Sequence, residues 1–334
     1  MRYLSAAAPW RHLFGLVVLA AAVAILAWRA DLPAVGRLLG EVRPLWLLPA
    51  VSLFGLSKFI HSQRWRLLLS PAGDGRGGEL YGLFSLANAV NALIPLRAGD
   101  VVRVQIAAGR LGESRAKVTA GVFVVETLLD GLAFALLLTI AVAFQAAPGP
   151  GGVVVGVFAV FVILAIGAAV LLGRHADYIG GRLAAWSPPA RWLAPRLASF
   201  VEGLSAFSNP GRLALLTTLS VAGWSLEATA YACFGEAFGL NLEPLAYIGL
   251  MIAANLVTAV PLTPFGIGVY ELGVQAVAVA LGAAEDEALA FAVGAHAALQ
   301  AYVLVAGLVA LLALRLKPGE VLYLRPRKRS KPGY

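Results

Sequence analysis

Charged residues and cysteine are scarce in this chain, and each shortage excludes a class of protein. Only 13% of the 334 residues are charged, whereas 60% are hydrophobic. Soluble domains of this size carry more polar residues, so the composition predicts a helical membrane protein that crosses the bilayer several times. The single cysteine, Cys233, excludes a disulfide framework and a cysteine-based metal site.

Signatures of catalysis and of metal binding are also lacking. None of the four histidines has a second histidine or a cysteine at ligand spacing, so we predict no metal site. The sequence shows no Ser-His-Asp ordering and no aspartate-rich cluster of the kind that holds Mg²⁺. Gly266 and Gly268 do not belong to a Walker motif, because no Lys-Ser/Thr follows them. We therefore expect neither enzymatic activity nor a cofactor.

Positive charge is concentrated near the end of the chain. The net charge is +8, and a basic cluster from Arg325 to Lys331 follows the last long apolar run. This position is typical of a segment that meets anionic lipid headgroups. We predict anionic lipid as a partner of this tail, expect no binding of nucleic acid, and make no prediction of the oligomeric state.

Long apolar runs predict six full membrane spans. About 20 helical residues cross a hydrocarbon core of about 30 Å. Two further apolar regions, 80–110 and 245–282, are broken by proline and glycine, and we interpret them as re-entrant hairpins. The predicted fold is all-α, with two re-entrant broken-helix hairpins and six full transmembrane helices at 12–28, 44–60, 117–145, 153–173, 211–238 and 287–314.

The positions of Lys and Arg predict the orientation of these spans. All 26 of them except Arg29, Arg37 and Arg43 fall in the segments that this layout places in the cytoplasm. Those segments are 1–11, 58–79, 97–117, 174–212 and 315–334. Both termini are then cytoplasmic, and the two hairpins enter the bilayer from opposite sides. Regions 44–145 and 211–314 therefore form a predicted inverted repeat.

The repeats are joined by a span at 153–173 and a basic segment at 174–210. Trp186 and Trp192 stand among arginines in this segment, as in an amphipathic segment at the membrane interface. An ordinary cytoplasmic loop is the alternative. Residues 315–334 form the predicted basic cytoplasmic tail.

The two interrupted regions are the candidate transport site. Backbone that leaves the helix at membrane depth must be buried in protein or line a cavity, and paired interruptions in matching positions point to a midplane site. The first interruption has Asn88, Asn91, Pro95, Arg97, Gly99 and Asp100. The second has Asn255, Pro261, Thr263, Pro264, Gly266, Gly268 and Glu271. We expect the glycines to allow a sharp turn, and the helix start that follows them to suit an anionic headgroup.

Ionisable residues within the apolar runs are further candidates. Glu126 and Asp130 share one helical face at i and i+4, so a cation is needed between them. Arg97 and Arg103 are the predicted partners. A purely structural ion-pair cluster is the alternative. In the second repeat, His296 and Gln300 also share a face at i and i+4.

Three motifs in order resemble the lysylphosphatidylglycerol synthase transmembrane family, which is flippase-like. The resemblance covers about residues 10–315 and implies a stand-alone lipid-translocating module without the aminoacyl-transfer domain, so lysine transfer to phosphatidylglycerol is not expected. The motifs are Asn91-Ala-Leu-Ile-Pro95-Leu-Arg97-Ala-Gly99-Asp100, Val125-Glu126-Thr-Leu-Leu-Asp130 and Pro261-Leu-Thr263-Pro264-Phe-Gly266-Ile-Gly268-Val-Tyr-Glu271.

The sequence as a whole predicts a flippase-like translocase of the bacterial inner membrane. It would move a phosphate-bearing or otherwise anionic (glyco)lipid through a polar cavity between the inverted repeats. A non-transporting partner of an envelope or lipid-biosynthesis enzyme, or a membrane enzyme acting on lipid-linked substrates, is the alternative. The predicted substrate-binding residues are Asn88, Asn91, Arg97, Asp100, Arg103, Glu126, Asp130, Asn255, Thr263, Glu271, His296 and Gln300.

Overall fold

The computed structural model describes residues 9–29, 31–69, 77–94, 98–111, 113–144, 209–259 and 262–316, together with residues 164, 167, 171, 175 and 178. Within these ranges the regular structure is helical, which agrees with the predicted all-α class. The chain divides into two compact units, which are described separately. The predicted linking span 153–173, the connector 174–210 and the tail 315–334 lie almost entirely outside the described residues.

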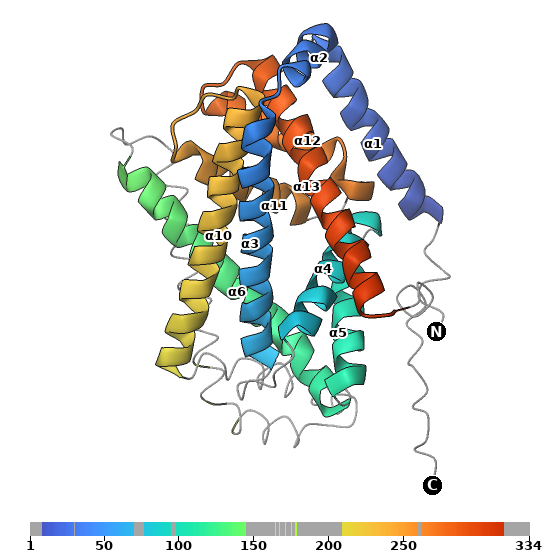
Figure 1. The fold of residues 1–334 in the computed structure, drawn as a ribbon, viewed down its shortest axis with the longest axis vertical. Coiled ribbons are helices and arrows are strands. Elements are labelled where there is room, and N and C mark those ends of the chain that lie inside the picture. The colour runs from blue at the N-terminus through green and yellow to red at the C-terminus, as the bar shows by residue number, and fades with distance from the viewer. Residues whose placement is uncertain are drawn as a thin grey trace. The chain divides into compact units, whose positions relative to one another are not determined.

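The described helices follow the apolar runs of the sequence (Figure 1). In chain order they are α1 (Pro9–Arg29), α2 (Leu32–Gly40), α3 (Pro44–Leu69), α4 (Gly77–Leu93), α5 (Ala98–Leu111), α6 (Glu113–Phe144), α10 (Pro210–Phe238), α11 (Ala246–Ala259), the 3₁₀ turn η3 (Pro264–Gly266), α12 (Val269–Ala280) and α13 (Glu285–Ala313).

Four helices are long and apolar enough to cross a membrane. They are α3, α10, α13 and the part of α6 from Val125 to Ala143. They coincide with four of the six predicted spans. The predicted span 12–28 is helical as part of α1, but its apolar stretch, Leu16–Leu26, is shorter than a full span.

Helix α3 continues past the predicted cytoplasmic boundary at residue 58. It ends at Leu69, and the apolar residues of its last turns lie in the protein core. Trp65 is fully buried, and Leu68 and Leu69 are also buried. Arg64 and His61 are therefore interior residues of a long helix, not residues of a cytoplasmic loop.

Both predicted interruptions occur as breaks between helices. Helix α4 ends at Leu93 and α5 begins at Ala98, while α11 ends at Ala259 and α12 begins at Val269 after the η3 turn. Pro95 and Pro261, the predicted helix breakers, lie outside the described residues. Gly99 lies where α5 meets α4, and a Cβ there would overlap the backbone carbonyl of Ala87.

The first unit comprises Met1–Leu56, Ala87–Gly99 and Ser225–Leu308. Within it α11 packs against α12, and α1 also contacts α12 (Figure 1). Val35 of α2 packs on Leu289 and Ala290 near the start of α13. These contacts hold the second interrupted region between helices of the same unit.

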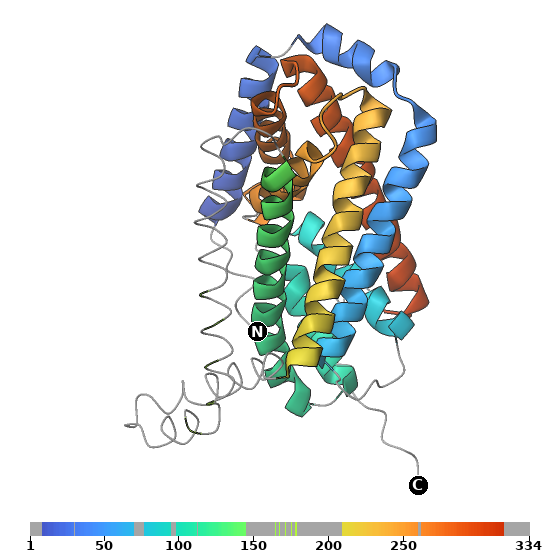
Figure 2. The same cartoon turned by 90° about the vertical axis from the view of Figure 1, so that its left-hand side faces the viewer.

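The second unit comprises Ser57–Leu86, Asp100–Trp224 and Val309–Tyr334. Its apolar core joins the later part of α3, the start of α4, the middle of α6 and the early part of α10. Helices α3 and α10 lie side by side here (Figure 2). Trp65, Leu83, Val125, Leu129 and Leu216 are buried in this core. Between helices in a bilayer such side chains contribute through van der Waals packing, because lipid is as apolar as the core.

Candidate functional site

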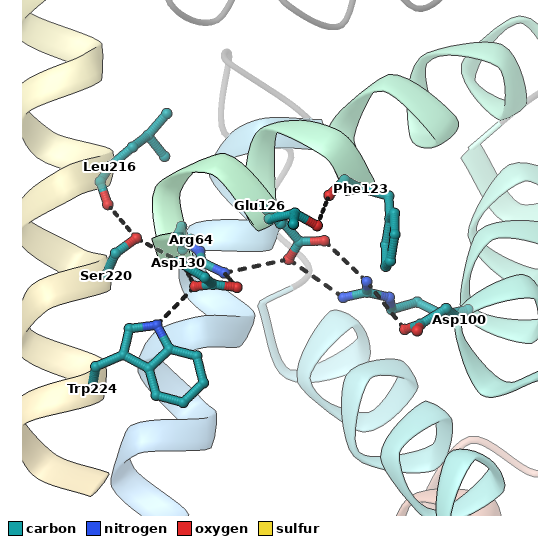
Figure 3. Close-up of polar contacts among 10 residues, drawn as sticks. Arg64, Asp100, Phe123, Glu126, Asp130, Leu216, Ser220 and Trp224 are labelled. Atoms are coloured by element: carbon teal, nitrogen blue, oxygen red, sulfur yellow. Dashed lines mark hydrogen bonds and ion pairs between the residues drawn. The ribbon is translucent and has the colours of Figure 1, made fainter. Parts of the chain in front are cut away.

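A buried ionic cluster lies in the second unit (Figure 3). We define the ionic cluster as the side chains of Arg64 from α3, Asp100 and Arg103 from α5, Glu126 and Asp130 from α6, and Ser220 and Trp224 from α10. Asp100, Arg103, Glu126 and Asp130 are among the predicted substrate-binding residues. Arg64 is a further ionisable candidate from the sequence, whereas Ser220 and Trp224 are not, and all three join the cluster where α3 and α10 meet α6.

Arg64 lies between the two carboxylates of α6. Its Nη1 and Nη2 donate to the two carboxylate oxygens of Asp130, and its Nη2 lies 3.9 Å from Oε1 of Glu126. Nη1 also donates to the Ser220 hydroxyl at 2.6 Å. The side chain is only 3% exposed. Arg64 is therefore a cation that relieves the repulsion between Glu126 and Asp130.

The sequence assigned this role to Arg97 and Arg103. Asp130 pairs with Arg64, which that prediction did not name as its partner. Arg97 lies outside the described residues. The signal for Arg64 in the sequence was a charge within a long apolar run.

Arg103 makes the predicted contact with Glu126. Its Nη2 donates to Oε2 at 2.9 Å and its Nη1 to Oε1 at 3.5 Å, a two-point geometry that fixes the guanidinium plane. Its Nη2 also lies 3.4 Å from Asp100. The guanidinium carbon sits 4.8 Å from the ring centre of Trp65 and 5.3 Å from that of Phe84, so aromatic faces add to its stabilisation.

The charges of the cluster almost balance. Its two arginines face the three carboxylates of Asp100, Glu126 and Asp130, which gives 2 − 3 = −1 when all are ionised. Trp224 donates its indole N–H to Asp130 at 2.8 Å, and the Nζ of Lys58 lies 5.5 Å from the Trp224 ring centre. Buried ionic groups are tolerated only with such partners.

Two buried nitrogen atoms of the cluster have no hydrogen-bond partner among the described residues. They are Nε of Arg64 and Nε of Arg103, and both are shielded from solvent. An arginine side chain suits carboxylate and phosphate oxygens.

A second polar group lies in the first unit. We define the histidine network as Glu271 of α12, His296 and Gln300 of α13, and the backbone of the turn that precedes α12. His296 Nδ1 contacts Oε1 of Glu271 at 2.6 Å. Gln300 Nε2 contacts His296 Nε2 at 3.0 Å, as their predicted shared face requires, and donates to the carbonyl of Phe265 at 3.0 Å.

The turn before α12 is tightly held. Phe265, Gly266 and Gly268 have positive φ angles of 56°, 75° and 83°. Position 268 needs glycine for a further reason, because a Cβ there would lie 2.6 Å from the Cβ of Ala22. Thr263 Oγ1 donates to the carbonyl of Ile267 at 2.9 Å and closes the loop.

Glu271 caps the helix that follows the turn. Its Oε2 accepts a hydrogen bond from the Gly268 backbone N–H at 2.6 Å. The start of α12 was expected to suit an anionic headgroup, but the chain's own carboxylate already occupies this amide. The role of Glu271 in the structure is therefore that of a helix cap and of a partner for His296.

Two of the three predicted asparagines hydrogen-bond to a neighbouring helix. Asn91 Oδ1 accepts from the Gly99 N–H at 2.8 Å and ties α4 to the start of α5. Asn255 Nδ2 donates to Oε1 of Glu227 at 2.9 Å. Asn88 is half-buried on α4.

Two buried tyrosines extend the histidine network, and sequence reasoning did not select them. Tyr270 stacks on the His296 ring with 4.0 Å between ring centres. Its hydroxyl lies 2.9 Å from that of Tyr231. A tyrosine in an apolar run resembles any other core residue, so no sequence pattern marks either of them.

The candidate residues thus fall into separate networks. Asp100, Arg103, Glu126 and Asp130 are together in the ionic cluster. Glu271, His296 and Gln300 form the histidine network, with Thr263, Gly266 and Gly268 in the adjoining turn. Among the described residues, no three His, Cys, Asp or Glu side chains are grouped to hold a metal ion.

Two curated proteins are similar to this chain. The glycosyltransferase AglD of Haloferax volcanii is 26% identical over 90% of this chain and 54% of its own length. A UPF0104 membrane protein of Methanocaldococcus jannaschii is 30% identical over 54% of this chain and 75% of its own length. The chain thus spans about half the length of AglD. No solved structure matches it.

The family comparison covers most of the described helices. The lysylphosphatidylglycerol synthase TM region matches residues 12–307, a range that includes both interrupted regions, the ionic cluster and the histidine network. The several apolar helices agree with a multi-pass membrane protein. The chain therefore belongs to the lysylphosphatidylglycerol synthase transmembrane family.

Proposed function

We propose that this protein is a translocase that moves a phosphate-bearing or otherwise anionic (glyco)lipid across the bacterial inner membrane. The observation that carries the proposal is the ionic cluster. Arg64 and Arg103 are 3% and 6% exposed and stand among apolar helices. Charges at membrane depth are costly, and they commonly mark the path of a polar substrate or ion. Family membership and the interrupted helices support the same function.

Arg103 is the side chain best arranged to meet a headgroup. Its contact with Glu126 is short and two-pointed, whereas its contact with Asp100 is longer, at 3.4 Å. The Asp100 side chain is also more exposed, at 19%. A headgroup phosphate therefore replaces Asp100 at Arg103 most readily, while Glu126 and Arg64 keep the arginine in place.

The proposed topology follows the sequence. The two interrupted regions are re-entrant and enter from opposite sides, both termini are cytoplasmic, and the basic tail contacts anionic lipid. In this proposal the acyl chains stay in the lipid phase and no bond is made or broken, so the protein is not an enzyme. The near absence of basic residues in the predicted outer segments supports this orientation.

A lipid-flipping assay tests the function. The purified protein is reconstituted into vesicles that contain fluorescent phosphatidylglycerol in both leaflets, and dithionite added outside quenches the accessible label. We expect wild-type protein to expose the inner-leaflet label and phosphatidylcholine to move more slowly. Arg103→Gln should slow phosphatidylglycerol at least about tenfold, since it removes a charge-assisted contact to the phosphate.

Arg43→Gln is the matched control for this assay. Arg43 is also an arginine paired with a glutamate, Glu236, but its side chain is 64% exposed. The control should flip lipid at the wild-type rate. Equal rates for Arg103→Gln and Arg43→Gln, with both proteins folded, would contradict the role of Arg103. Absence of flipping by the wild type in bacterial lipid would contradict the translocase itself.

The similarity to AglD favours a second candidate. That relative is named a glycosyltransferase, and the alignment covers most of this chain. A membrane component that acts on, or serves an enzyme of, lipid-linked sugar transfer is therefore the alternative. Incubating the purified protein with a prenyl phosphate and sugar nucleotides distinguishes the two. A glycosylated lipid product would favour the enzyme, and a stoichiometric co-purified enzyme would favour the partner role.

A further inference from the structure

We propose that the Glu271–His296 pair is a proton-binding site whose occupancy sets the conformation of the turn from Pro264 to Gly268. The site lies wholly within the first unit. It does not depend on the proposed translocase function, and its test involves no lipid transport. Gln300 links the two parts of the site, because its side chain contacts both the histidine and the turn.

The geometry defines where the ring proton lies. His296 Nδ1 is 2.6 Å from a carboxylate oxygen of Glu271, so Nδ1 carries the hydrogen and donates it. The opposite ring nitrogen, Nε2, then has a lone pair. Gln300 Nε2 lies 3.0 Å away and donates one of its two hydrogens to that lone pair. Its second hydrogen goes to the carbonyl of Phe265.

The Phe265 carbonyl fixes the orientation of the glutamine amide. A carbonyl oxygen accepts only, so the group that faces it at 3.0 Å must be the Gln300 NH₂. The other end of the amide, Oε1, is buried and has no hydrogen-bond partner in the part of the chain that the structure describes. The buried amide of Gln300 therefore has a second orientation available. A half-turn of the amide group exchanges the positions of its nitrogen and its oxygen.

A proton taken up at Nε2 of His296 drives that half-turn. Nε2 then becomes a donor and faces the donor NH₂ of Gln300. Rotation of the amide brings Oε1 to the ring nitrogen, where it accepts the new hydrogen. The same rotation removes the NH₂ from Phe265 and places an oxygen against its carbonyl, so the turn loses a stabilising contact.

The turn is a segment that such a loss will move. Phe265 is a non-glycine residue at φ 56°, a strained conformation that the surrounding contacts must hold. Two of those contacts are independent of the glutamine, namely Thr263 to Ile267 and Gly268 to Glu271. We therefore infer a local opening of the turn and not unfolding of α12.

His296 is the group of this network that binds the proton, as the side chains around it indicate. Helix α12 contributes Glu271 and the stacked ring of Tyr270, whose hydroxyl contacts Tyr231 of α10. Glu227 of α10 is buried and bonded to Asn255 of α11. From α1, the residues nearest to the turn are the apolar Ala22 and Leu19. The sequence has no lysine or arginine between residues 212 and 315, so no cation from α11, α12 or α13 competes.

Hydrogen–deuterium exchange of the full chain in detergent tests the inference. Exchange is followed by mass spectrometry between about pH 8.0 and about pH 5.5. Rates are divided by the chemical exchange rate at each pH. We expect peptide 262–272 to lose protection about fivefold at the lower pH, the effect of one neutral hydrogen bond. A peptide from α11, residues 246–256, should keep its protection.

Three variants separate a proton site from a structural contact. His296→Gln should remove the pH dependence, and Gln300→Met should leave the turn poorly protected at both pH values. His61→Gln, which replaces the other buried histidine, should keep the wild-type response.

The wild-type result decides the matter even if His296→Gln does not fold. Equal corrected protection of the turn at both pH values would overturn the inference. So would a loss of protection that extends through α11, or a pH response that persists in His296→Gln.

Discussion

Arg103 shows how a charge is kept in the interior of this chain. Its side chain is 6% exposed, donates to Glu126 at 2.9 Å and lies over the Trp65 ring. The whole pair is costly to bury, but removing one member costs more, because the remaining charge has neither water nor a partner. The same holds for Arg64, which depends on Asp130 and Glu126.

Replacing Glu126 should therefore destabilise the protein strongly. We expect Glu126→Gln to lower the free energy of unfolding by about 3–5 kcal/mol, as for other broken buried ion pairs. Glu236→Gln, which breaks the exposed pair with Arg43, should cost less than about 1 kcal/mol. Denaturation of both variants in the same detergent measures the difference. Equal costs would show that the ionic cluster is as solvated as the surface pair.

At the scale of elements, the interrupted helices depend on close backbone approach. Gly99, in the first turn of α5, lies directly against α4, and Asn91 accepts its N–H. The turn before α12 depends on positive φ angles and on a missing Cβ next to Ala22. In both places a small residue is required because another segment occupies the space that a side chain would take.

Gly99→Ala tests this packing. Its Cβ would overlap the Ala87 carbonyl, a backbone atom that no side-chain rotation can move. We expect a loss of about 3 kcal/mol in the free energy of unfolding, at the upper end of overpacking effects. Gly36→Ala in α2 is the matched control, since no atom lies within 4 Å of its Cβ position.

The control should be neutral or stabilising by up to about 1 kcal/mol, because alanine favours a helix over glycine. Thermal unfolding of the two variants gives the comparison. A Gly99→Ala protein as stable as Gly36→Ala would mean that α4 and α5 do not approach as closely as described.

The sequence predicted elements better than partners. Apolar runs located four of the six predicted spans, and helix breaks fall within both predicted interrupted regions, because these signals are local and strong. Spacing also predicted the shared faces of Glu126 with Asp130 and of His296 with Gln300. It did not identify Arg64 as the partner of Asp130, because they are 66 residues apart and only the packing of α3 on α6 brings them together.

At the scale of the whole molecule, the described residues of each compact unit include a buried polar network, and the two networks differ in kind. The ionic cluster in the second unit contains two arginines, whereas the histidine network in the first contains a histidine, a glutamate and a glutamine. Only the ionic cluster has fixed positive charge. The proposed lipid contact therefore belongs to the ionic cluster, and the proposed proton site belongs to the histidine network.

The chemistry of the bound lipid tests the central claim most directly. Native mass spectrometry of the full chain, released from micelles with equal amounts of phosphatidylglycerol and phosphatidylcholine, reads the preference without any transport step. We predict that the wild type retains phosphatidylglycerol in excess and that Arg103→Gln loses this excess while Arg43→Gln keeps it. Equal retention of both lipids by the wild type, or the same excess in Arg103→Gln, would contradict the assignment of the ionic cluster as the headgroup site.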